Sequence, residues 1–291
     1  LTDILSDIGS MLRVTAANPG YAMNVLNSSW KKCIAYFEGK LSIRFSSLLR
    51  FLSLSIAKIP LKANPYDIPV ISLTGEIFVR RDEFSRKNIV DYFENRGFMV
   101  RITPLAEYIC YGNYVVNNKL GEKKFTILDQ FKFRMVSQVQ EWWEKRIKNI
   151  MFTSGVYKPE MIDVEKTING VNHLINENFR GECILTVGIA MREILNDSCG
   201  VISIGPFGCM YSRMAESILK KEMTVEGKKR IPGWNNSVNM FKGIDKLPFL
   251  SIESDGNPFP QLTEANLESF VLQAKRIHKI LQKNKGRKDS V

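Results

Sequence analysis

The chain of 291 residues is long enough for one large domain or two small ones. Hydrophobic residues make up 44% of it and charged residues 24%, a balance that excludes a disordered or fibrous chain. The net charge of +11 suggests a nucleic-acid partner, but residues 31–62 and 275–291 contribute +6 each, so the rest sums to −1. We therefore expect a neutral body with a basic stretch near its start and a basic tail.

The first segment of the chain has a helical pattern, which the prolines of residues 64–69 interrupt. Between Leu41 and Ala57 the apolar residues recur at a roughly helical period, with Arg44 and Arg50 among them. A basic amphipathic helix can lie on a membrane surface. We favour the alternative, a helix that packs on the body with its basic residues outward.

Targeting and membrane signals are not visible in this sequence. Residues 1–13 lack the basic start and apolar run of a signal peptide. No apolar run approaches the ~18 residues that a membrane span needs. We expect no membrane partner. The start at Leu1 instead of Met predicts a processed or excised piece of a longer protein.

A first βαβ unit follows residues 64–69. Val70–Leu73 predicts a short buried strand, residues 85–95 an amphipathic helix that ends at Gly97, and Phe98–Ile102 a second strand. Two strands joined through a helix imply a parallel pair with a right-handed crossover.

Residues 105–195 have a largely helical pattern, with helices predicted over 125–150, 164–178 and 183–195. The first of these carries a stripe of apolar and aromatic residues near helical spacing. Such a stripe can line a ligand site, but we favour a stripe that faces the core. Its residues are Phe131, Met135, Val139, Trp142, Trp143 and Ile147.

A second α/β stretch completes the chain. Strands are predicted at 200–204 and 248–252, a tight turn at 205–209, helices at 212–223 and 263–282, and a polar loop at 224–246. Alternating strands and helices indicate an α/β fold with an open parallel sheet of the Rossmann or flavodoxin type. The predicted organisation is a helical N-terminal segment at 1–63, an α/β region at 64–282 with a helical insertion at 105–195, and a basic tail at 283–291.

Three predicted strands end in segments that could carry chemistry: residues 74–76, 205–209 and 253–257. Ligands of parallel α/β sheets bind at the carboxyl ends of the strands. This places Glu76, Glu253 and Asp255 as candidate binding residues around one pocket. Glycine and aspartate are also common in ordinary turns, so each loop alone is equally well explained as a connection.

The five cysteines are an odd number and include no Cys-x-x-Cys, so we expect no disulfide framework and a cytosolic setting. Cys209 follows Gly-Pro-Phe-Gly and precedes a predicted helix. Free backbone N–H groups and the positive helix end favour a thiolate there, which can ligate a metal or an iron–sulfur cluster. A buried, inert cysteine is an equally good interpretation from the chemistry alone.

The remaining cysteines are weaker candidates. Cys33 and Cys183 lie within helical patterns and are predicted core residues. Cys199 precedes a strand whose five residues span about 16 Å, too far from Cys209 to share a metal. Cys110 follows the second strand and could lie at the same sheet edge as Cys209, as a second metal ligand.

Several common sites are not supported. The sequence contains neither Gly-x-x-x-x-Gly-Lys-Ser/Thr nor Gly-x-Gly-x-x-Gly, which argues against a P-loop and a standard dinucleotide site. His173 and His278 are isolated on predicted helices, and neither forms a convincing catalytic triad with an acid and a nucleophile. No RNA-binding motif of aromatic and basic residues is found either.

Three motifs, at residues 71–85, 200–210 and 250–261, resemble the C-terminal region of large CoA-substrate-specific enzyme activases. That region is related to the subunits of 2-hydroxyacyl-CoA dehydratases. The resemblance runs from about residue 64 to residue 282 and keeps the order of the motifs.

The resemblance implies parallel α/β units and a [4Fe–4S] cluster held by cysteines at strand ends. Cys209 matches the ligand of the second α/β unit. The other ligands of the family come from an N-terminal α/β unit that is not evident in this chain. The family's ATP-binding, actin-like domain also precedes this region, so no ATP site is expected here.

The resemblance therefore predicts a module of a dehydratase/activase system, with an activator, dehydratase subunits or the rest of a larger activase chain as partners. One alternative is a non-enzymatic scaffold domain that keeps the fold. Another is a module for a CoA ester, whose phosphates would meet Arg80, Arg81 or the basic stretch; these arginines could equally pair with Asp82 and Glu83. Nucleic acid is a distant further possibility.

Overall fold

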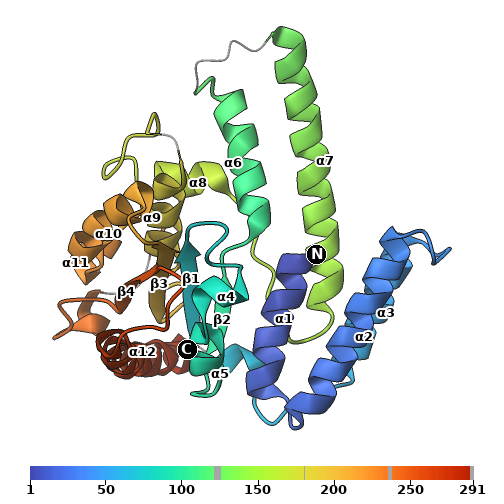
Figure 1. The fold of residues 1–291 in the computed structure, drawn as a ribbon, viewed down its shortest axis with the longest axis horizontal. Coiled ribbons are helices and arrows are strands. Elements are labelled where there is room, and N and C mark those ends of the chain that lie inside the picture. Colours follow the sequence, from blue (N-terminus) through green and yellow to red (C-terminus); the bar gives the residue numbers. More distant parts are fainter. Residues whose placement is uncertain (121–125, 180, 235–237, 289–291) are drawn as a thin grey trace. The chain divides into compact units, whose positions relative to one another are not determined.

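The computed structural model describes residues 1–120, 126–179, 181–234 and 238–288 of the chain, except the side chains of 127, 238–239 and 284–288 (Figure 1). The chain forms two compact units, and each is discontinuous in sequence. One comprises residues 1–68 and 104–162, and the other comprises residues 69–103 and 163–291. We call them the helical unit and the α/β unit.

The α/β unit contains a four-stranded sheet in which every strand pair is parallel, so the predicted fold class is confirmed. The strand order is β2-β1-β3-β4, which matches the first four strands of flavodoxin-like sheets. Ile71 lies opposite both Val100 and Gly200, which fixes the register at the centre. The strands are β1 (Val70–Gly75), β2 (Met99–Ile102), β3 (Gly200–Pro206) and β4 (Phe249–Ser254).

One face of the sheet packs on α5 (Ile89–Glu94) and α12 (Gln261–Lys288). Phe93 is the centre of this layer, since its ring makes edge-to-face contacts with Phe98 at 6.0 Å and Phe270 at 5.7 Å between centroids. Aromatic pairs of this kind add to the stabilisation from burial alone.

The opposite face packs on α9 (Glu182–Glu193) and α10 (Met210–Glu222). Residues alternate across a strand, so Ser72, Thr74 and Ser203 point to this face while Ile71 and Leu73 point to the other. All three hydroxyl residues are buried, and their small side chains permit close helix packing. Remaining elements of this unit are α4 (Glu83–Arg86), α8 (Val164–Asn169), α11 (Val225–Lys229) and η2 (Val238–Phe241).

Two helices predicted in this unit differ from those observed. The helix expected over 85–95 is split into α4 and α5, because Lys87 has a φ of +51° between them. The helix expected over 164–178 ends at Asn169, and turns follow it. The loop expected at 224–246 contains α11, which Thr224 caps by accepting a hydrogen bond from the Gly227 N–H.

The helical unit consists of α1 (Thr2–Thr15), α2 (Pro19–Phe37), α3 (Phe45–Ala57), η1 (Pro65–Asp67), α6 (Leu105–Asn117) and α7 (Ile127–Phe152). Helix α3 buries four apolar side chains while Arg44 and Arg50 stay exposed. The predicted helix packed with its basic residues outward is therefore confirmed. The buried side chains are Leu48, Leu49, Leu52 and Ile56.

The two units divide the chain differently from the predicted domains. Residues 104–162 fold with the N-terminal helices, because α6 packs on α7 and α7 packs on α3. Residues 163–195 belong to the α/β unit, where α9 packs on β1. The predicted insertion at 105–195 is thus shared between the units. In the predicted tail, the backbone of α12 continues to Lys288, while the side chains of 284–291 lie outside the described residues.

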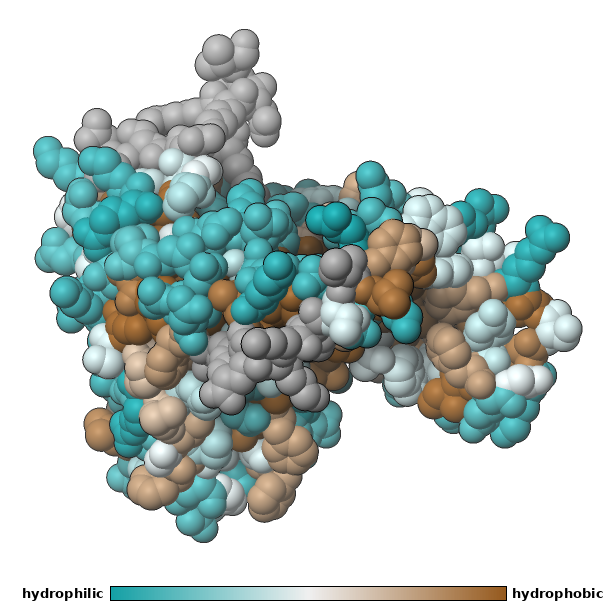
Figure 2. Space-filling model, turned by 90° about the horizontal axis from the view of Figure 1, so that it is seen from above, coloured by the Kyte–Doolittle hydropathy of each residue, from teal (hydrophilic) through white to brown (hydrophobic). Residues whose placement is uncertain are grey.

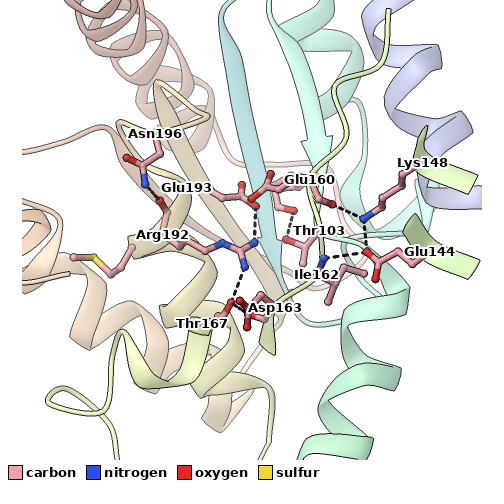
Figure 3. A network of polar contacts seen from close by, with 12 residues as sticks. Thr103, Glu144, Lys148, Glu160, Ile162, Asp163, Thr167, Arg192, Glu193 and Asn196 are labelled. Atoms are coloured by element: carbon pink, nitrogen blue, oxygen red, sulfur yellow. Dashed lines mark hydrogen bonds and ion pairs between the residues drawn. The ribbon is translucent and has the colours of Figure 1, made fainter. Parts of the chain in front are cut away.

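Buried charges are held by local polar networks in each unit (Figure 3). In the helical unit, Lys148 donates to Glu144 at 2.5 Å, and Glu144 accepts from the Ile162 N–H at 2.9 Å. In the α/β unit, Arg192 donates to Thr167 Oγ1 at 2.7 Å. Lys228 is fully buried and donates to the carbonyls of Met191 and Arg192 at the end of α9.

Within the described part of the chain, none of the helices combines the length and the apolar composition that crossing a membrane requires.

The close approach of β1 and β3 predicts that Gly75 cannot be replaced. Gly75 has a φ of +114°, and a Cβ atom there would lie 2.0 Å from the Ile204 carbonyl oxygen. We expect Gly75→Ala to lower the free energy of unfolding by more than ~3 kcal/mol, measured by urea denaturation. Gly97→Ala is the matched control, since Gly97 has a φ of +83° but nothing within 4 Å of its added Cβ. Equal losses in the two variants would contradict the close contact.

Candidate functional site

The loops that follow β1, β3 and β4 are fastened to one another at the carboxyl edge of the sheet. The Glu76 N–H donates to the Ile204 carbonyl at 2.9 Å, and the Phe207 N–H donates to the Ser254 carbonyl at 3.0 Å. Ser254 Oγ in turn donates to the Ser85 carbonyl at 2.5 Å. The three segments predicted from the sequence are therefore brought together at one edge.

The boundary between β1 and β3 is the point where the connections leave the sheet on opposite faces. The chain passes from β1 to α5 on one face and from β3 to α10 on the other. In open α/β sheets this boundary is the usual ligand crevice. Gly205 lies at it, and a Cβ atom there would lie 2.1 Å from Ser212 Oγ. Beside it, Thr74 Oγ1 is buried and has no hydrogen-bond partner among the described residues.

Two carboxyl groups meet at the end of β1. Glu76 Oε2 accepts from the Val79 N–H at 2.8 Å, and Glu182 Oε1 accepts from the Ile77 N–H at 3.2 Å. Burial raises the pKa of Glu182, and the charge of Glu76 raises it further. A half-buried carboxyl group whose pKa is raised by a carboxylate neighbour is a common arrangement in proton-transferring sites.

Glu253 and Asp255 lie at the end of β4 but have different surroundings. Glu253 Oε2 pairs with Arg213 of α10 at 2.5 Å, and its Oε1 accepts weakly from the Gly208 N–H at 3.4 Å. Asp255 is exposed, and hydrogen bonds from the Asn257 side chain and backbone lower its pKa. Glu253 therefore anchors the loop of Cys209, whereas Asp255 stabilises its own turn.

Cys209 is the N-cap residue of α10, and its side chain is half-buried and makes no capping hydrogen bond. Cys183 lies in the first turn of α9, which packs on α10. Both helices begin at the carboxyl edge of the sheet, because α9 leads into the start of β3 and α10 leaves its end. Burial raises the pKa of the Cys183 thiol to about 11, and Cys209 adds to this rise.

The other cysteines lie elsewhere. Cys199 precedes β3, at the opposite edge of the sheet, and burial raises its pKa to about 12. Cys110 lies on α6 in the helical unit, not in the unit that contains Cys209. Burial and then the charges of Glu144, Glu107 and Glu141 raise the pKa of Cys110 to about 11, which disfavours a thiolate.

Arg80 and Arg81 direct their guanidinium groups to the backbone. Arg80 is buried and donates to the Gly75 carbonyl at 2.6 Å. Arg81 donates to the carbonyls of Ile102 and Thr103 at 3.2 and 2.9 Å. These contacts stiffen the loop after β1 and leave the pair poorly placed to meet CoA phosphates.

The residues described in the structure contain no group of three or more His, Cys, Asp or Glu side chains that could hold a metal ion.

Glu182, Cys183 and Arg213 are site residues that the sequence reasoning missed. Cys183 was predicted to be a core residue, and it is buried, with an exposed fraction of 1%. The position of Cys183 at this edge could have been inferred from the topology, because a helix that leads into a parallel strand must begin at the carboxyl edge of the sheet. The contact of Glu182 with the turn after β1 had no such signal, since it joins segments 105 residues apart.

The carboxyl pair predicts a pH-dependent stability. Because the folded-state pKa of Glu182 is raised, its contribution to stability is lost as the pH rises from the usual glutamate value through that folded pKa. We expect Glu182→Gln, which keeps an acceptor for Ile77, to raise the urea midpoint at pH 8 and to do so less at pH 5. Glu165→Gln, in the first turn of α8 and exposed, is the control. A gain that is independent of pH would argue against the charge pair.

The thiols are expected to differ in reactivity. We expect iodoacetamide to modify Cys209 in the folded protein at least ~10-fold faster than Cys183 or Cys199, because those two are buried and their pKa values are raised. Peptide mass spectrometry measures the three rates. The differences should vanish in urea, and equal rates in the native protein would contradict the assigned exposures.

Comparison with known proteins found no match: no family model, no curated protein and no solved structure matches this chain.

Proposed function

We propose that this chain is a module of a 2-hydroxyacyl-CoA dehydratase/activase-type system that supplies Cys209 to an iron–sulfur site for electron transfer. The observation that carries the proposal is the meeting of the three resembling motifs. They lie far apart in sequence, and each provides one of the fastened loops at the ends of β1, β3 and β4. The parallel strands bring the three loops to one edge, and the hydrogen bonds between the loops join them there.

The thiols of this chain do not fit a complete cluster. A [4Fe–4S] cluster takes four thiolates in most proteins, or three with one open iron. At this edge the described residues offer Cys209, which is accessible, and Cys183, whose burial keeps its thiol protonated. We therefore place the missing ligands on a partner, either a dehydratase subunit or another part of a longer activase chain.

The neighbours of Cys209 have roles that do not depend on a bound group. Arg213 and Glu253 hold the loop of Cys209 against β4 through their ion pair. Arg213 is about half exposed, so this pair contributes to positioning more than to stability. The N-terminal ends of α9 and α10 both face this edge and favour negative charge there, as a thiolate brings.

The scaffold alternative, a domain that keeps the fold without the chemistry, is supported by the single accessible thiol at this edge. The CoA-ester alternative is supported less, because Arg80 and Arg81 are engaged with backbone carbonyls. A scaffold would bind its partner whether or not Cys209 is present, which separates it from the proposed module.

The test is an anaerobic reconstitution of the full chain with iron and sulfide, alone and together with a purified 2-hydroxyacyl-CoA dehydratase and its activator. We expect the chain alone to retain little iron and the mixture to retain a cluster, seen by its charge-transfer absorbance. Cys209→Ala should lower the iron bound in the mixture at least ~5-fold. Cys199→Ala is the matched control, since this thiol lies at the opposite edge of the sheet.

Each outcome decides between the candidates. A complex that forms equally well with Cys209→Ala and carries the same iron would overturn the role of Cys209. A complex without iron would favour the scaffold. Absence of any complex would refute membership in this system.

A further inference from the structure

Two side-chain environments outside the candidate site differ from what the sequence predicts. The apolar stripe of α7 is predicted to face the core, and this prediction is wrong, because the stripe is largely exposed. Phe131, Met135, Val139 and Trp142 have exposed fractions of 64, 49, 54 and 54%. On the face drawn in Figure 2, hydrophobic side chains likewise lie exposed among hydrophilic ones. The reverse case is Lys228, which lies in a segment predicted to be a polar loop and is fully buried.

Lys228 caps the C-terminal end of α9 from a different helix. It lies in α11, and its Nζ donates to the Met191 carbonyl at 2.6 Å and to the Arg192 carbonyl at 2.8 Å. Helix α9 ends at Glu193, so both carbonyls belong to its last turn and have no N–H partner within the helix. The side chain of Lys228 therefore supplies donors that α9 itself lacks.

The hydrogen bonds of Lys228 fit a neutral amine better than an ammonium group. An ammonium group has three N–H donors, whereas an amine has two. Among the described residues, Lys228 Nζ has the two carbonyls as acceptors and pairs with no carboxylate. Lys148, which is buried in the helical unit, does have such a partner, since it donates to Glu144. Protonation of Lys228 would bury a third N–H and a full charge without a partner for either, which is costly.

The charges near Lys228 only partly offset the effect of its burial. Asp197 and Glu193, at the end of α9 and beyond it, favour the protonated form, and Arg192 disfavours it. Burial is the largest influence, and it lowers the pKa of Lys228 from the ordinary value of 10.5 to about 7. Lys228 therefore changes its charge close to neutral pH.

The other elements that pack on α11 leave this balance unchanged. These elements are α10 and η2. On α10, Glu222 is buried and pairs with Arg230, the residue that follows α11, while Lys220 and Lys221 are exposed. The sequence of η2 contains no titratable residue. The charge state of Lys228 is thus decided by its own burial and by the charged residues at the end of α9.

Helix α11 depends on the side chains that it buries. It has five residues, which are too few for a helix to be stable by itself. Its buried residues are Val225, Gly227 and Lys228. Val225 contributes apolar burial, Gly227 has no side chain, and Lys228 makes the hydrogen bonds to α9. A change in the free energy of burying Lys228 therefore changes how firmly the whole helix is held.

We propose that Lys228 is a proton-operated latch: its neutral amine holds α11 against the end of α9, and uptake of a proton releases α11 so that the ammonium group reaches water. The latch makes the local order of this segment depend on pH. It does not rest on the function proposed above, since the end of α9 lies at the amino edge of the sheet and Cys209 lies at the carboxyl edge.

The direction of the pH dependence follows from proton linkage. The released lysine keeps its proton up to its ordinary pKa of 10.5, whereas the docked lysine keeps it only up to about 7. Between these two values the released form binds more protons, so the docked form gains stability as the pH rises. Docking of α11 is therefore weaker at pH 6 than at pH 8.

Hydrogen exchange of the full chain, measured by mass spectrometry of peptides that cover residues 225–231, is the test. We expect the protection factor of this segment, corrected for the intrinsic effect of pH on exchange, to be about 10-fold lower at pH 6 than at pH 8. Lys228→Met keeps the length of the side chain and removes the titrating group, so it should abolish the difference. Lys229→Met is the matched control, because Lys229 is exposed in the same helix and its replacement should preserve the difference. Equal protection at both pH values in the wild-type chain, or a difference that persists in Lys228→Met, overturns the proposal.

A measurement on the wild-type chain decides the matter even if Lys228→Met does not fold. In protein labelled with ¹³C-lysine, the Cε resonance of each lysine reports its titration by NMR. We expect one lysine resonance to titrate near pH 7. A spectrum in which no lysine titrates below about pH 9 would show that Lys228 is charged when α11 is docked, which contradicts the latch.

Discussion

The parallel pairing of β1 with β3 is the contact on which the α/β unit depends. It joins residues 71–75 to residues 200–204, and both strands are almost wholly buried. Each outer strand pairs with only one of these two, so neither β2 nor β4 has a place in the sheet without the central pair. The same pairing brings the turn of Gly75 against Ile204 and thereby sets the boundary at which the candidate site lies.

Much of this unit follows from local sequence signals. All four strands were predicted within two residues of their observed ends, because short apolar runs flanked by glycine and proline are distinctive. The position of the three loops at one edge of the sheet could also be predicted, since parallel strands all end at the same edge. The split of the helix at Lys87 was not predictable, because a positive φ at a lysine has no local sequence signal.

What the sequence could not reveal is which surfaces find a partner. The periodicity of α7 identifies Phe131, Met135 and Val139 as neighbours on one face, and this was correct. Periodicity is silent on whether another element covers that face. Helix α6 determines which face of α7 is covered, because its Asn113 donates a hydrogen bond to Gln140 on another face of α7. In the same way, no sequence pattern predicts the hydrogen bond from the Ile77 N–H to Glu182, because it joins segments that lie far apart in the sequence.

The discontinuity of both units has a consequence during synthesis. The chain completes β1 and β2 long before β3, with all of α6 to α9 between them. At the usual pace of translation, the segment between Gly75 and Gly200 takes on the order of ten seconds to make. Throughout that interval one edge of β1 has no strand to pair with, and an open apolar edge invites pairing with other chains. Correct folding of this unit therefore requires that edge of β1 to stay unpaired with other chains until β3 has been made.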